Sequence, residues 1–264
     1  MVSVRLRAER LALRYRGGPS VLEDLDLDLS AGELVAVVGL NGAGKSTLLR
    51  ALAGLLPAAD GRVLLDGTAV HTLSAQARAQ RIAFVPQALA SLPPTTVERF
   101  VLGGRYAHLG FLRLPGPHDH ATARAALAQT DVTRHAERPL AELSGGERQR
   151  VLVARALAQQ AAVLLCDEPV AAFDLPHQLE LLDLLAELAR SGHVVALSTH
   201  DLNLASQYAD RIAVLHEGRL LVADTPARAL SPETVAHVWG RRLRVDRDDQ
   251  GRPRITPARQ PGAS

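Results

Sequence analysis

Apolar and polar residues alternate along the first thirty positions of the chain. The segments VSVRLRAERLALRY (2–15) and VLEDLDLDLS (21–30) change from one class to the other at almost every step. Successive side chains of a strand point to opposite faces of a sheet, so this alternation predicts strands with one buried face. We therefore expect the chain to begin with antiparallel strands.

A different hydrophobic pattern begins at residue 33. The segments ELVAVVG (33–39), AVLLCDE (162–168) and HVVALSTH (193–200) contain continuous apolar runs, which predict strands buried on both faces. The helical pattern PHQLELLDLLAELARSG (176–192) separates the last two, and this βαβ arrangement implies a parallel sheet with a right-handed crossover. Further strands are predicted at GRVLLDG, at RIAFVPQ and in the hairpin RIAVLHEGRLLVAD.

The segment between about 95 and 160 is helical in character and includes the Ala-rich stretches HATARAALAQT and GERQRVLVARALAQQ. We therefore predict an α/β fold in a single domain over residues 1–256. It has a mainly parallel sheet, an N-terminal antiparallel β-subdomain and a helical subdomain inserted at approximately 88–160. Residues 257–264 are expected to form a disordered tail.

The composition is typical of a globular protein. Hydrophobic residues make up 47% of the chain and charged residues 22%, and the formal net charge of +2 gives little general attraction to nucleic acid. The single cysteine, Cys166, excludes an internal disulfide and is expected to be an inert strand residue. The apolar runs are far shorter than the roughly 20 residues that span a bilayer, and the N-terminus lacks the pattern of a signal peptide. We therefore expect a cytosolic chain that does not cross a membrane by itself.

Lysine occurs once among the 30 lysines and arginines of the chain, at Lys45 in GLNGAGKST (39–47). This segment matches G-x-x-x-x-G-K-[ST], with the required buried strand before it and a helical pattern, KSTLLRALAGLL, after it. Gly39, Gly42 and Gly44 allow the backbone to curl so that its N–H groups point at an anion, and the start of the helix adds a positive dipole end. The alternative is a glycine-rich turn that matches by chance.

The chemistry of a phosphate loop explains why the one lysine is here. Lys45 would place a compact ammonium between the β- and γ-phosphates of a nucleotide, where the wide planar fork of arginine does not fit. The hydroxyl of Ser46 would face Mg²⁺. The fold is therefore predicted to have a P-loop NTPase core, of the RecA-like kind. Its expected nucleotide-binding residues are Gly39, Asn41, Gly42, Ala43, Gly44, Lys45, Ser46 and Thr47.

Two carboxylates follow directly on the buried strand of AVLLCDE. Asp167 would hold Mg²⁺ through a water, and Glu168 would polarise the water that attacks the γ-phosphate. Two acids at a strand end are also typical of a solvated turn. Beside a phosphate loop they predict ATP hydrolysis.

A second candidate anion site lies in LSGGERQR (143–150), where Ser144, Gly145 and Gly146 open a helix. Ser144 and Glu147 also have the spacing of a capping box, in which each side chain accepts the other residue's backbone N–H. The capping box is compatible with anion binding, but it explains neither of the two glycines.

Together, the phosphate loop, LSGGERQR, LLCDEP and LSTHDL resemble the nucleotide-binding subunit of ABC transporters. The resemblance covers about residues 3–256, and few other families carry the octapeptide. It implies ATP and Mg²⁺ as cofactors. It also implies a head-to-tail dimer of two copies of the chain, in which Ser144 and Gly146 of one copy close over the γ-phosphate held by the other.

The resemblance implies roles for five further positions. Tyr15 matches the aromatic residue that stacks on adenine, and Val21 would pack nearby. Gln87 matches the glutamine that reaches Mg²⁺ and the attacking water and links them to the membrane partner. His200 matches the histidine that senses the γ-phosphate, and Asp174 matches the aspartate that contacts the other subunit. An ordinary strand tyrosine remains the alternative for Tyr15.

The chain departs from the family pattern after its DEP segment. Val170 and Ala171 stand where Thr-Ser or a similar pair is usual, and Phe173 replaces a common leucine. These positions lie beside the expected contact across the dimer. We therefore expect ATP binding more firmly than communication between the two sites.

The resemblance also implies the partners and the place of action. A cassette without a spanning helix needs separate permease subunits, and its contact surface is expected near Gln87 and residues 88–118. The chain would lie at the cytoplasmic face of the membrane as a peripheral subunit, served indirectly by a substrate-binding protein, and it would not bind nucleic acid.

The segment that follows Gln87 is similar to importers of iron-siderophore, haem and cobalamin, and also to zinc and manganese importers, and PHQLELLDLLAELA and the C-terminal segment from HDLNLAS onward favour the first group. The resemblance therefore implies the ATP-hydrolysing subunit of an importer of that group, with a zinc or manganese importer as the alternative. The same motifs are compatible with three more functions. These are a soluble ABC ATPase acting on DNA or ribosomes, a nucleotide-binding module that does not hydrolyse, and a separate-subunit exporter.

Overall fold

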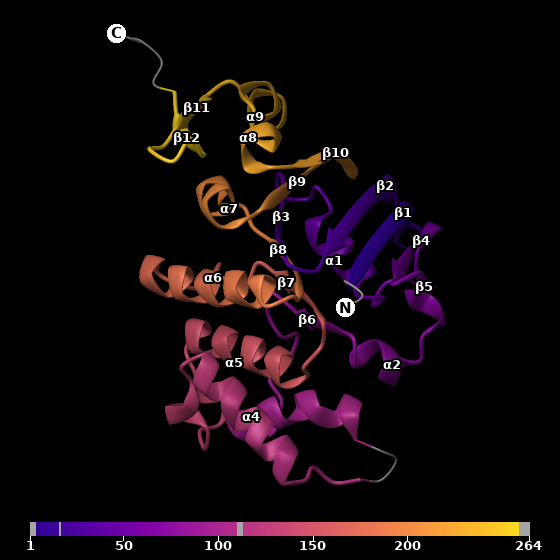
Figure 1. Cartoon of the computed structure of the whole chain (residues 1–264), viewed down its shortest axis with the longest axis vertical. Helices are drawn as coiled ribbons and strands as arrows, with labels where there is room; N and C mark the ends of the chain where they lie inside the picture. The colour runs from indigo at the N-terminus through magenta and orange to yellow at the C-terminus, as the bar shows by residue number, and fades with distance from the viewer. Residues whose placement is uncertain (1–3, 16, 110–112, 259–264) are drawn as a thin grey trace.

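Two sheets of different kinds form the frame of the molecule (Figure 1). The computed structural model describes residues 4–15, 17–109 and 113–258. The first sheet is antiparallel, and β1 pairs with β2 from Arg5 opposite Ser30 to Arg14 opposite Ser20. The predicted N-terminal antiparallel strands are thus confirmed. The order of this sheet is β2-β1-β4-β5, and its strands are β1 (Arg5–Arg14), β2 (Ser20–Ser30), β4 (Asp60–Leu65) and β5 (Thr68–Ala69).

The second sheet has six strands in the order β10-β9-β3-β8-β7-β6. Five of them run parallel to their neighbours, and β10 is added antiparallel at one edge as the second strand of the predicted hairpin. The mainly parallel sheet predicted from the sequence is therefore confirmed. The strands are β3 (Leu34–Val38), β6 (Ile82–Val85), β7 (Val163–Asp167), β8 (Val194–Ser198), β9 (Arg211–His216) and β10 (Arg219–Asp224).

Strand β3 shows why its apolar run is continuous. Its side chains alternate between two hydrophobic cores: Leu34 and Ala36 belong to one, and Val35 and Val37 belong to the other. All five residues of β3 are buried. A strand that is covered on both faces has no solvent side, so it needs no polar residue.

Helix α1 (Lys45–Leu52) lies between the two sheets, where it contacts β7 and β8 on one side and β1 and β2 on the other. The core around α1 is built from the antiparallel sheet and one face of the six-stranded sheet. The phosphate loop between β3 and α1 is thereby fixed at both of its ends by buried elements.

Helices α3 to α9 lie on the side of the other face of the six-stranded sheet, whereas α2 lies apart, below β5 (Figure 1). Helices α3, α4 and α5 lie between β6 and β7 in the sequence and pack on one another. Helix α6 is the crossover from β7 to β8. The α-helices other than α1 are α2 (Ala75–Ala79), α3 (Val97–Leu102), α4 (Pro117–Gln129), α5 (Gly145–Ala158), α6 (Leu175–Arg190), α7 (Leu202–Tyr208), α8 (Pro226–Ala229) and α9 (Pro232–Trp239). The 3-10 helices are η1 (Val70–Thr72), η2 (Gly103–His108), η3 (Thr133–His135) and η4 (Leu140–Glu142).

A third, two-stranded sheet lies near the C-terminus, at the top left of Figure 1. Strand β11 (Leu243–Arg247) pairs antiparallel with β12 (Pro253–Pro257). The sequence pattern predicts no strand here, and it places Pro257 in the tail, whereas β12 includes this residue. Residues 259–264 of the predicted tail lie outside the described residues.

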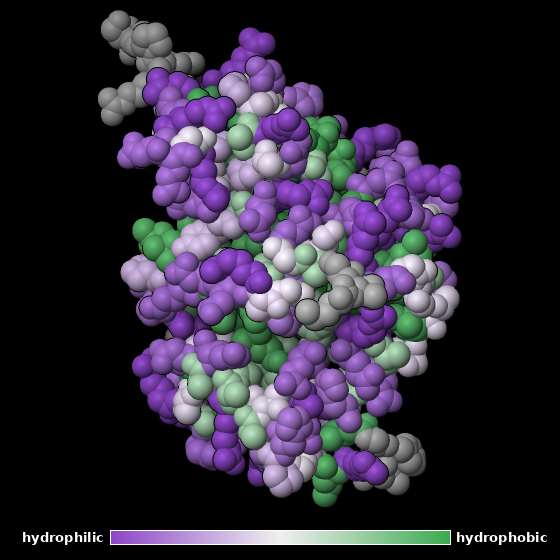
Figure 2. Space-filling view, viewed as in Figure 1, coloured by the Kyte–Doolittle hydropathy of each residue, from purple (hydrophilic) through white to green (hydrophobic). Residues whose placement is uncertain are grey.

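Hydrophilic residues cover most of the face shown in Figure 2, and hydrophobic residues appear there in small patches. In the part of the chain that the structure describes, no helix combines the length and the apolar character that a membrane span needs.

Candidate functional site

The backbone of the phosphate loop depends on two of its glycines for shape. Gly39 has φ +154°, and a Cβ atom there would lie 2.2 Å from the carbonyl oxygen of Leu215. Gly44 has φ +103°, and its Cβ would lie 2.8 Å from Cδ2 of Leu22. A side chain at either position would clash, and backbone with positive φ is itself costly for other residues. The loop therefore has one conformation that only these glycines permit.

Gly42 has a different reason to be glycine. It also has positive φ, at +81°, but no atom lies within 4 Å of the position of a Cβ. The space beside Gly42 is open, so a ligand can approach its backbone closely. Next to it, Asn41 is exposed, whereas Ala43 is 6% exposed and donates its N–H to the carbonyl of Leu40 at 3.2 Å.

Lys45 folds back over the loop. Its Nζ donates to the carbonyl oxygens of Gly39 at 2.9 Å and Leu40 at 3.1 Å, and the residue is only 6% exposed. Burial lowers the pKa of the ammonium, and the charges of Glu168 and Asp167 oppose that shift. An ammonium has three N–H donors, so one is left for an anion after these two contacts.

Asp167 is the buried carboxylate of the site. Its Oδ1 accepts hydrogen bonds from the hydroxyls of Ser46 and Ser198, both at 2.8 Å, and the residue is 1% exposed. Its Oδ2 is buried without any hydrogen-bond partner, and a guanidinium nitrogen of Arg50 lies 4.0 Å from it. A buried anionic oxygen without a partner is costly. Its presence here indicates a site prepared for a cation.

Three polar groups meet at Glu168, directly after β7. The side chain of Gln87 donates from Nε2 to Oε2 of Glu168 at 2.9 Å, and Nδ1 of His200 lies 3.8 Å from the same oxygen. The backbone N–H of Glu168 donates to Oγ of Ser198 at 3.0 Å, and φ of Glu168 is +46°. Positive φ is uncommon for a glutamate and is often found at functional positions. The structure therefore brings together the three residues that the sequence assigned to hydrolysis.

Tyr15 and Val21 lie beside the phosphate loop. The phenol of Tyr15 is 3.1 Å from Oγ1 of Thr47, in the first turn of α1, and the residue is 44% exposed. The carbonyl oxygen of Val21 is 3.2 Å from where a Cβ on Gly44 would be. An exposed aromatic ring next to the loop is in reach of a nucleotide base.

The start of α5 forms a separate group. Ser144 caps the helix: its Oγ accepts the N–H of Glu147 at 3.2 Å, and Oε2 of Glu147 accepts the N–H of Ser144 at 2.8 Å. Gly145 is exposed, and a Cβ on Gly146 would lie 3.1 Å from the ring of Phe173. The predicted capping box is present, and the second glycine leaves room for Phe173.

A hollow of about 480 Å³ extends from this helix start to the loop before α6. Ser144, Gly145, Gly146, Phe173 and Asp174 are among its lining residues. Asp174 forms an ion pair with His177, and the hydrogen bond from His177 lowers the pKa of the carboxyl. Among the described residues, no hydrogen bond or ion pair joins Ser144, the two glycines or Asp174 to the phosphate loop. The predicted site residues therefore form two groups within one copy of the chain.

Sequence reasoning missed two residues of these groups, Ser198 and Arg50, and it missed the contact between Phe173 and Gly146. Ser198 could have been found, because it ends a predicted parallel strand two residues before His200. In the structure it pairs with Asp167 across β7 and β8. The contact of Phe173 with Gly146 joins segments that are distant in sequence, and no pattern signals it.

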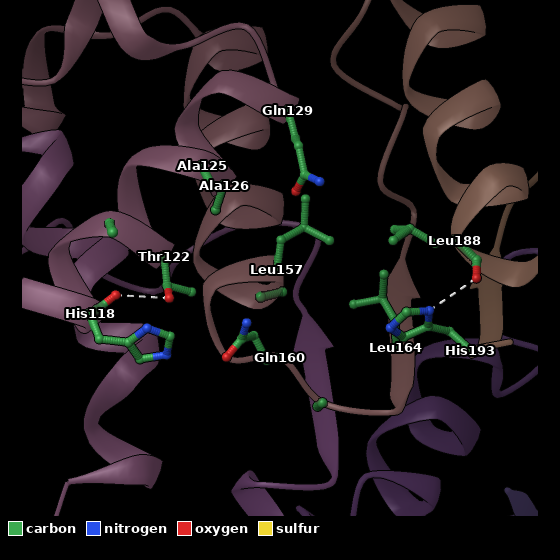
Figure 3. A pocket seen from close by; sticks show the side chains of 13 residues that line it. His118, Thr122, Ala125, Ala126, Gln129, Leu157, Gln160, Leu164, Leu188 and His193 are labelled. Carbon is green, nitrogen blue, oxygen red and sulfur yellow. Dashed lines mark hydrogen bonds between the residues drawn. The ribbon is translucent and has the colours of Figure 1, made fainter. Parts of the chain in front are cut away.

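Another hollow, of about 510 Å³, lies between α4, the end of α5 and the segments around β7 and the end of α6 (Figure 3). None of the predicted site residues lines it. The hydrogen bonds drawn there join Thr122 to the carbonyl of His118 and His193 to that of Leu188. Its lining is alanine, leucine and neutral polar side chains together with these two histidines, so it lacks the converging donors of a phosphate site.

Comparison with known proteins agrees with the resemblance. The pattern of the ABC transporter family matches residues 22–171. The hemin import ATP-binding protein HmuV of Streptomyces coelicolor is 44% identical over 231 residues, which are 88% of this chain and 82% of HmuV. The ferric enterobactin transport ATP-binding protein FepC of Escherichia coli is 36% identical over 96% of this chain and 94% of FepC. The cobalamin import ATP-binding protein BtuD of Halobacterium salinarum is 43% identical over 91% of this chain, but the match spans only 60% of BtuD.

Two solved structures share the fold. One is an ABC transporter in an inward-facing conformation, with a TM-score of 0.81, 29% identity and coverage of 96% of this chain and 97% of that one. The other is a dimeric ATP-binding cassette in a post-hydrolysis state bound to ADP and Pi, with a TM-score of 0.75, 28% identity and coverage of 83% and 98%.

The fold and the loop thus define an α/β nucleotide-binding protein with a phosphate loop. The chain belongs to the ABC transporter family. The fold class and the family predicted from the sequence are both confirmed.

Proposed function

We propose that the chain is the ATP-hydrolysing subunit of an importer, and that it drives separate permease subunits. The observation that carries this proposal is the group around β7 and β8, where Asp167 has a buried unpartnered oxygen and Glu168 is held by Gln87 and faced by His200. For stability alone, neutral residues with all their hydrogen bonds formed would serve better than this charged group. It fits the cleavage of a metal-bound triphosphate.

The phosphate loop would bind the triphosphate. Its curled backbone and the start of α1 offer N–H groups, and no side chain caps that helix start. Lys45 would use its remaining N–H donor on the β- and γ-phosphates. Tyr15 would stack on the adenine with Val21 beside it, once its phenol leaves Thr47 or turns about that contact.

Ser46, Asp167 and Gln87 fit a bound Mg²⁺. The set consists of a hydroxyl, a carboxylate and an amide, which are the oxygen donors that Mg²⁺ prefers, and Oδ2 of Asp167 accepts no hydrogen bond, with the guanidinium of Arg50 4.0 Å away. Bound with ATP, Mg²⁺ would neutralise charge on the phosphates. Ser198 would keep Asp167 oriented through its hydrogen bond to Oδ1.

Glu168 would act on the attacking water as a general base. Its carboxylate lies at the end of β7 between the amide of Gln87 and the ring of His200, and these groups fix where it points. His200 would donate to the γ-phosphate. Both roles require a γ-phosphate placed by Lys45.

A second copy of the chain would complete each ATP site. In one copy, Ser144 and Gly146 line their own hollow and have no hydrogen bond to the phosphate loop, which supports a partner in head-to-tail orientation that would bring the two together. The hydroxyl oxygen of Ser144 already accepts the N–H of Glu147, and its proton stays free for a phosphate oxygen. Asp174 would contact the other subunit at the same interface. The dimeric cassette among the related structures supports this arrangement.

The permease would dock at a groove of about 350 Å³ next to Gln87. Pro86 lines this groove together with Leu55, Phe84 and Leu89, and Arg78 and Arg155 add positive charge. A movement of Gln87 on ATP binding would then act directly on the docked permease. A chain that works this way lies on the cytoplasmic face of the membrane, peripherally, and meets a substrate-binding protein only through the permease.

The cargo class follows from the relatives. Their names specify hemin, ferric enterobactin and cobalamin, which are metal chelates too large for a simple ion channel. We infer cargo of the iron-siderophore, haem or cobalamin kind rather than free zinc or manganese. No residue of an ATPase subunit contacts the cargo, so its permease decides among them.

Replacing Glu168 by glutamine tests the catalytic proposal. Glu168→Gln keeps the shape and the hydrogen bond to Gln87 but removes the base, so ATP hydrolysis should fall by roughly 1,000-fold while ATP binding persists. Phosphate release from the purified chain and uptake into vesicles with the cognate permease measure the two effects. The matched control is Glu137→Gln, at an exposed glutamate, which should change neither.

Uptake that persists in the Glu168→Gln variant would contradict an ATP-driven importer. Hydrolysis without any association with membranes, together with co-purified nucleic acid, would instead favour a soluble ATPase acting on DNA or ribosomes.

A further inference from the structure

Helix α7 begins immediately after His200, so its position determines where that ring lies. Asp201 is the N-cap of α7, and its Oδ1 accepts the N–H groups of Asn203 at 2.9 Å and Leu204 at 3.0 Å. The helix has only seven residues. A helix of this length is unstable alone, so it depends on contacts with other elements.

The C-terminal hairpin supplies such contacts along α7. The amide of Asn203 pairs with the backbone of Ile255 in β12 in both directions: Oδ1 accepts its N–H at 2.8 Å, and Nδ2 donates to its carbonyl at 3.1 Å. Ser206, which is fully buried, donates its hydroxyl to the carbonyl of Pro253 at 2.7 Å. The two side chains together form hydrogen bonds with backbone groups of β12, as the backbone of a neighbouring strand would.

The far end of α7 is held by a charge. The guanidinium of Arg252, in the hairpin turn, donates to the carbonyl oxygens of Ser206 and, at 2.7 Å, Gln207. A cation at these carbonyls complements the negative end of the helix. Ile255 is 9% exposed and belongs to the main hydrophobic core, so the hairpin itself is anchored.

We propose that the C-terminal hairpin is a brace that positions His200 for ATP hydrolysis, with Asn203 and Arg252 as positioning residues. The hairpin holds α7 in place, and His200 lies just before the N-terminus of that helix, 3.8 Å from Glu168. Hydrolysis is sensitive to small displacements of the groups around the γ-phosphate. This inference rests on the proposed function, because it needs His200 to act in hydrolysis.

The test is a double-mutant cycle between Asn203 and His200. Asn203→Leu keeps the size of the side chain and removes both hydrogen bonds to Ile255. We expect kcat for ATP hydrolysis to fall by roughly tenfold with KM for ATP nearly unchanged, because the phosphate loop, Lys45 and Tyr15 would supply most of the binding contacts. In a His200→Ala background, the same substitution should leave single-turnover ATP cleavage unchanged.

Arg254→Ala is the matched control, at an exposed position of β12 outside these contacts with α7, and it should leave kcat unchanged. Thermal unfolding of every variant separates lost folding from lost positioning, and hydrogen exchange at Asn203 and Leu204 should be faster in Asn203→Leu.

An equal loss of cleavage with and without His200 would overturn the brace, since the hairpin would then act through stability alone. Unchanged kcat in Asn203→Leu would overturn it as well. A wild-type chain that hydrolyses no ATP at all would contradict the proposed function instead, and the hydrogen-exchange result would still report whether the hairpin holds α7.

Discussion

Glycines precede α1 and open α5, yet these two helix N-termini are prepared for an anion in opposite ways. At α1 the cap residue is Gly44, which has no side chain to satisfy the first N–H groups. At α5 the cap is Ser144, and its exchange of hydrogen bonds with Glu147 satisfies part of that need internally. The first N–H groups of α1 therefore have no side-chain cap when no ligand is bound, whereas at α5 the capping box satisfies one N–H group of the helix start without a ligand.

The glycines of the two sites also differ in purpose. Gly39, Gly42 and Gly44 all have positive φ, and a side chain at Gly39 or Gly44 would also clash with neighbouring residues. Gly145 and Gly146 do not have positive φ; they are needed for space, at an exposed surface and against Phe173. Glycine-rich segments that look alike in sequence thus provide shape at one site and room for close approach at the other.

This difference fits the proposed dimer, in which the two sites would meet. The cradle around Lys45 contains a buried ammonium and faces two carboxylates, so it can bind most of a nucleotide alone. The tip of α5 has no lysine and carries an acid, Glu147, in its first turn. Such a tip binds an anion weakly by itself, and it becomes useful only when another copy presents a phosphate already held.

Among the changes that test this comparison, substitutions of Lys45 are expected to have the largest effect. Two variants of this residue test the role of the phosphate loop. Lys45→Ala removes the one charge-assisted donor that is left for the phosphates, which contributes up to about 3 kcal/mol, so ATP affinity should fall by up to about 100-fold. Lys45→Arg should fail to a similar degree, because the guanidinium does not fit under the loop. Equilibrium titration with a fluorescent ATP analogue measures both, and circular dichroism checks that the variants fold.

Near-normal affinity in Lys45→Arg would contradict the steric explanation for the one lysine in the chain. The loss of ATP affinity in Lys45→Ala would then reflect only the missing positive charge.

A smaller effect is expected from Gly146→Val, which sharpens the comparison at the tip. The new side chain would meet the ring of Phe173 and project where a partner must approach. ATP binding by the single chain should stay normal, while ATP-driven dimerisation of a Glu168→Gln background should weaken by about tenfold. Gel filtration with ATP measures the dimer, and the fluorescent titration measures binding. Equal loss of binding and dimerisation would show that the two sites are not separate.

Much of this comparison could be predicted from the sequence, because its signals are local. The phosphate loop is one continuous motif between a buried strand and a helix, and the capping box of Ser144 and Glu147 has a fixed spacing. Alternation and continuous apolar runs likewise distinguished the antiparallel strands from the parallel ones. The convergence of Gln87, Glu168 and His200 was expected only through family resemblance, and the structure brings them together.

What the sequence did not predict depends on contacts between distant segments. Phe173 meets Gly146 across the hollow, and Arg50 approaches Asp167 from a different element. The C-terminal hairpin was missed because β12 is short and has proline at both ends, which hides its alternation. Its stability comes from side chains of α7, and no local pattern contains that information.

The smallest effect concerns the charge at the tip of α5. Hydrogen bonds from Ser144, backbone first, lower the pKa of Glu147 in the folded protein, with the charges of His135 and Arg138 adding to the shift and burial opposing it. A carboxyl whose pKa is lowered by folding stabilises the fold above its unfolded pKa of about 4.3, and this contribution is lost as the pH falls through the folded value. The charge at this partly exposed helix start should therefore matter at pH 7 and not in acid.

Glu147→Gln keeps an acceptor for the N–H of Ser144 but removes the charge. At pH 7 the variant should be less stable than the wild type by about 0.5 kcal/mol, and the two should become equal at an acid pH below the folded pKa of Glu147, as measured by urea unfolding. Glu137→Gln, at an exposed glutamate outside these contacts, should match the wild type at both pH values. A difference that is the same at both would mean that the amide fails as a cap. Such a result would show that geometry, and not charge, holds the tip of α5, as geometry already does at the cradle.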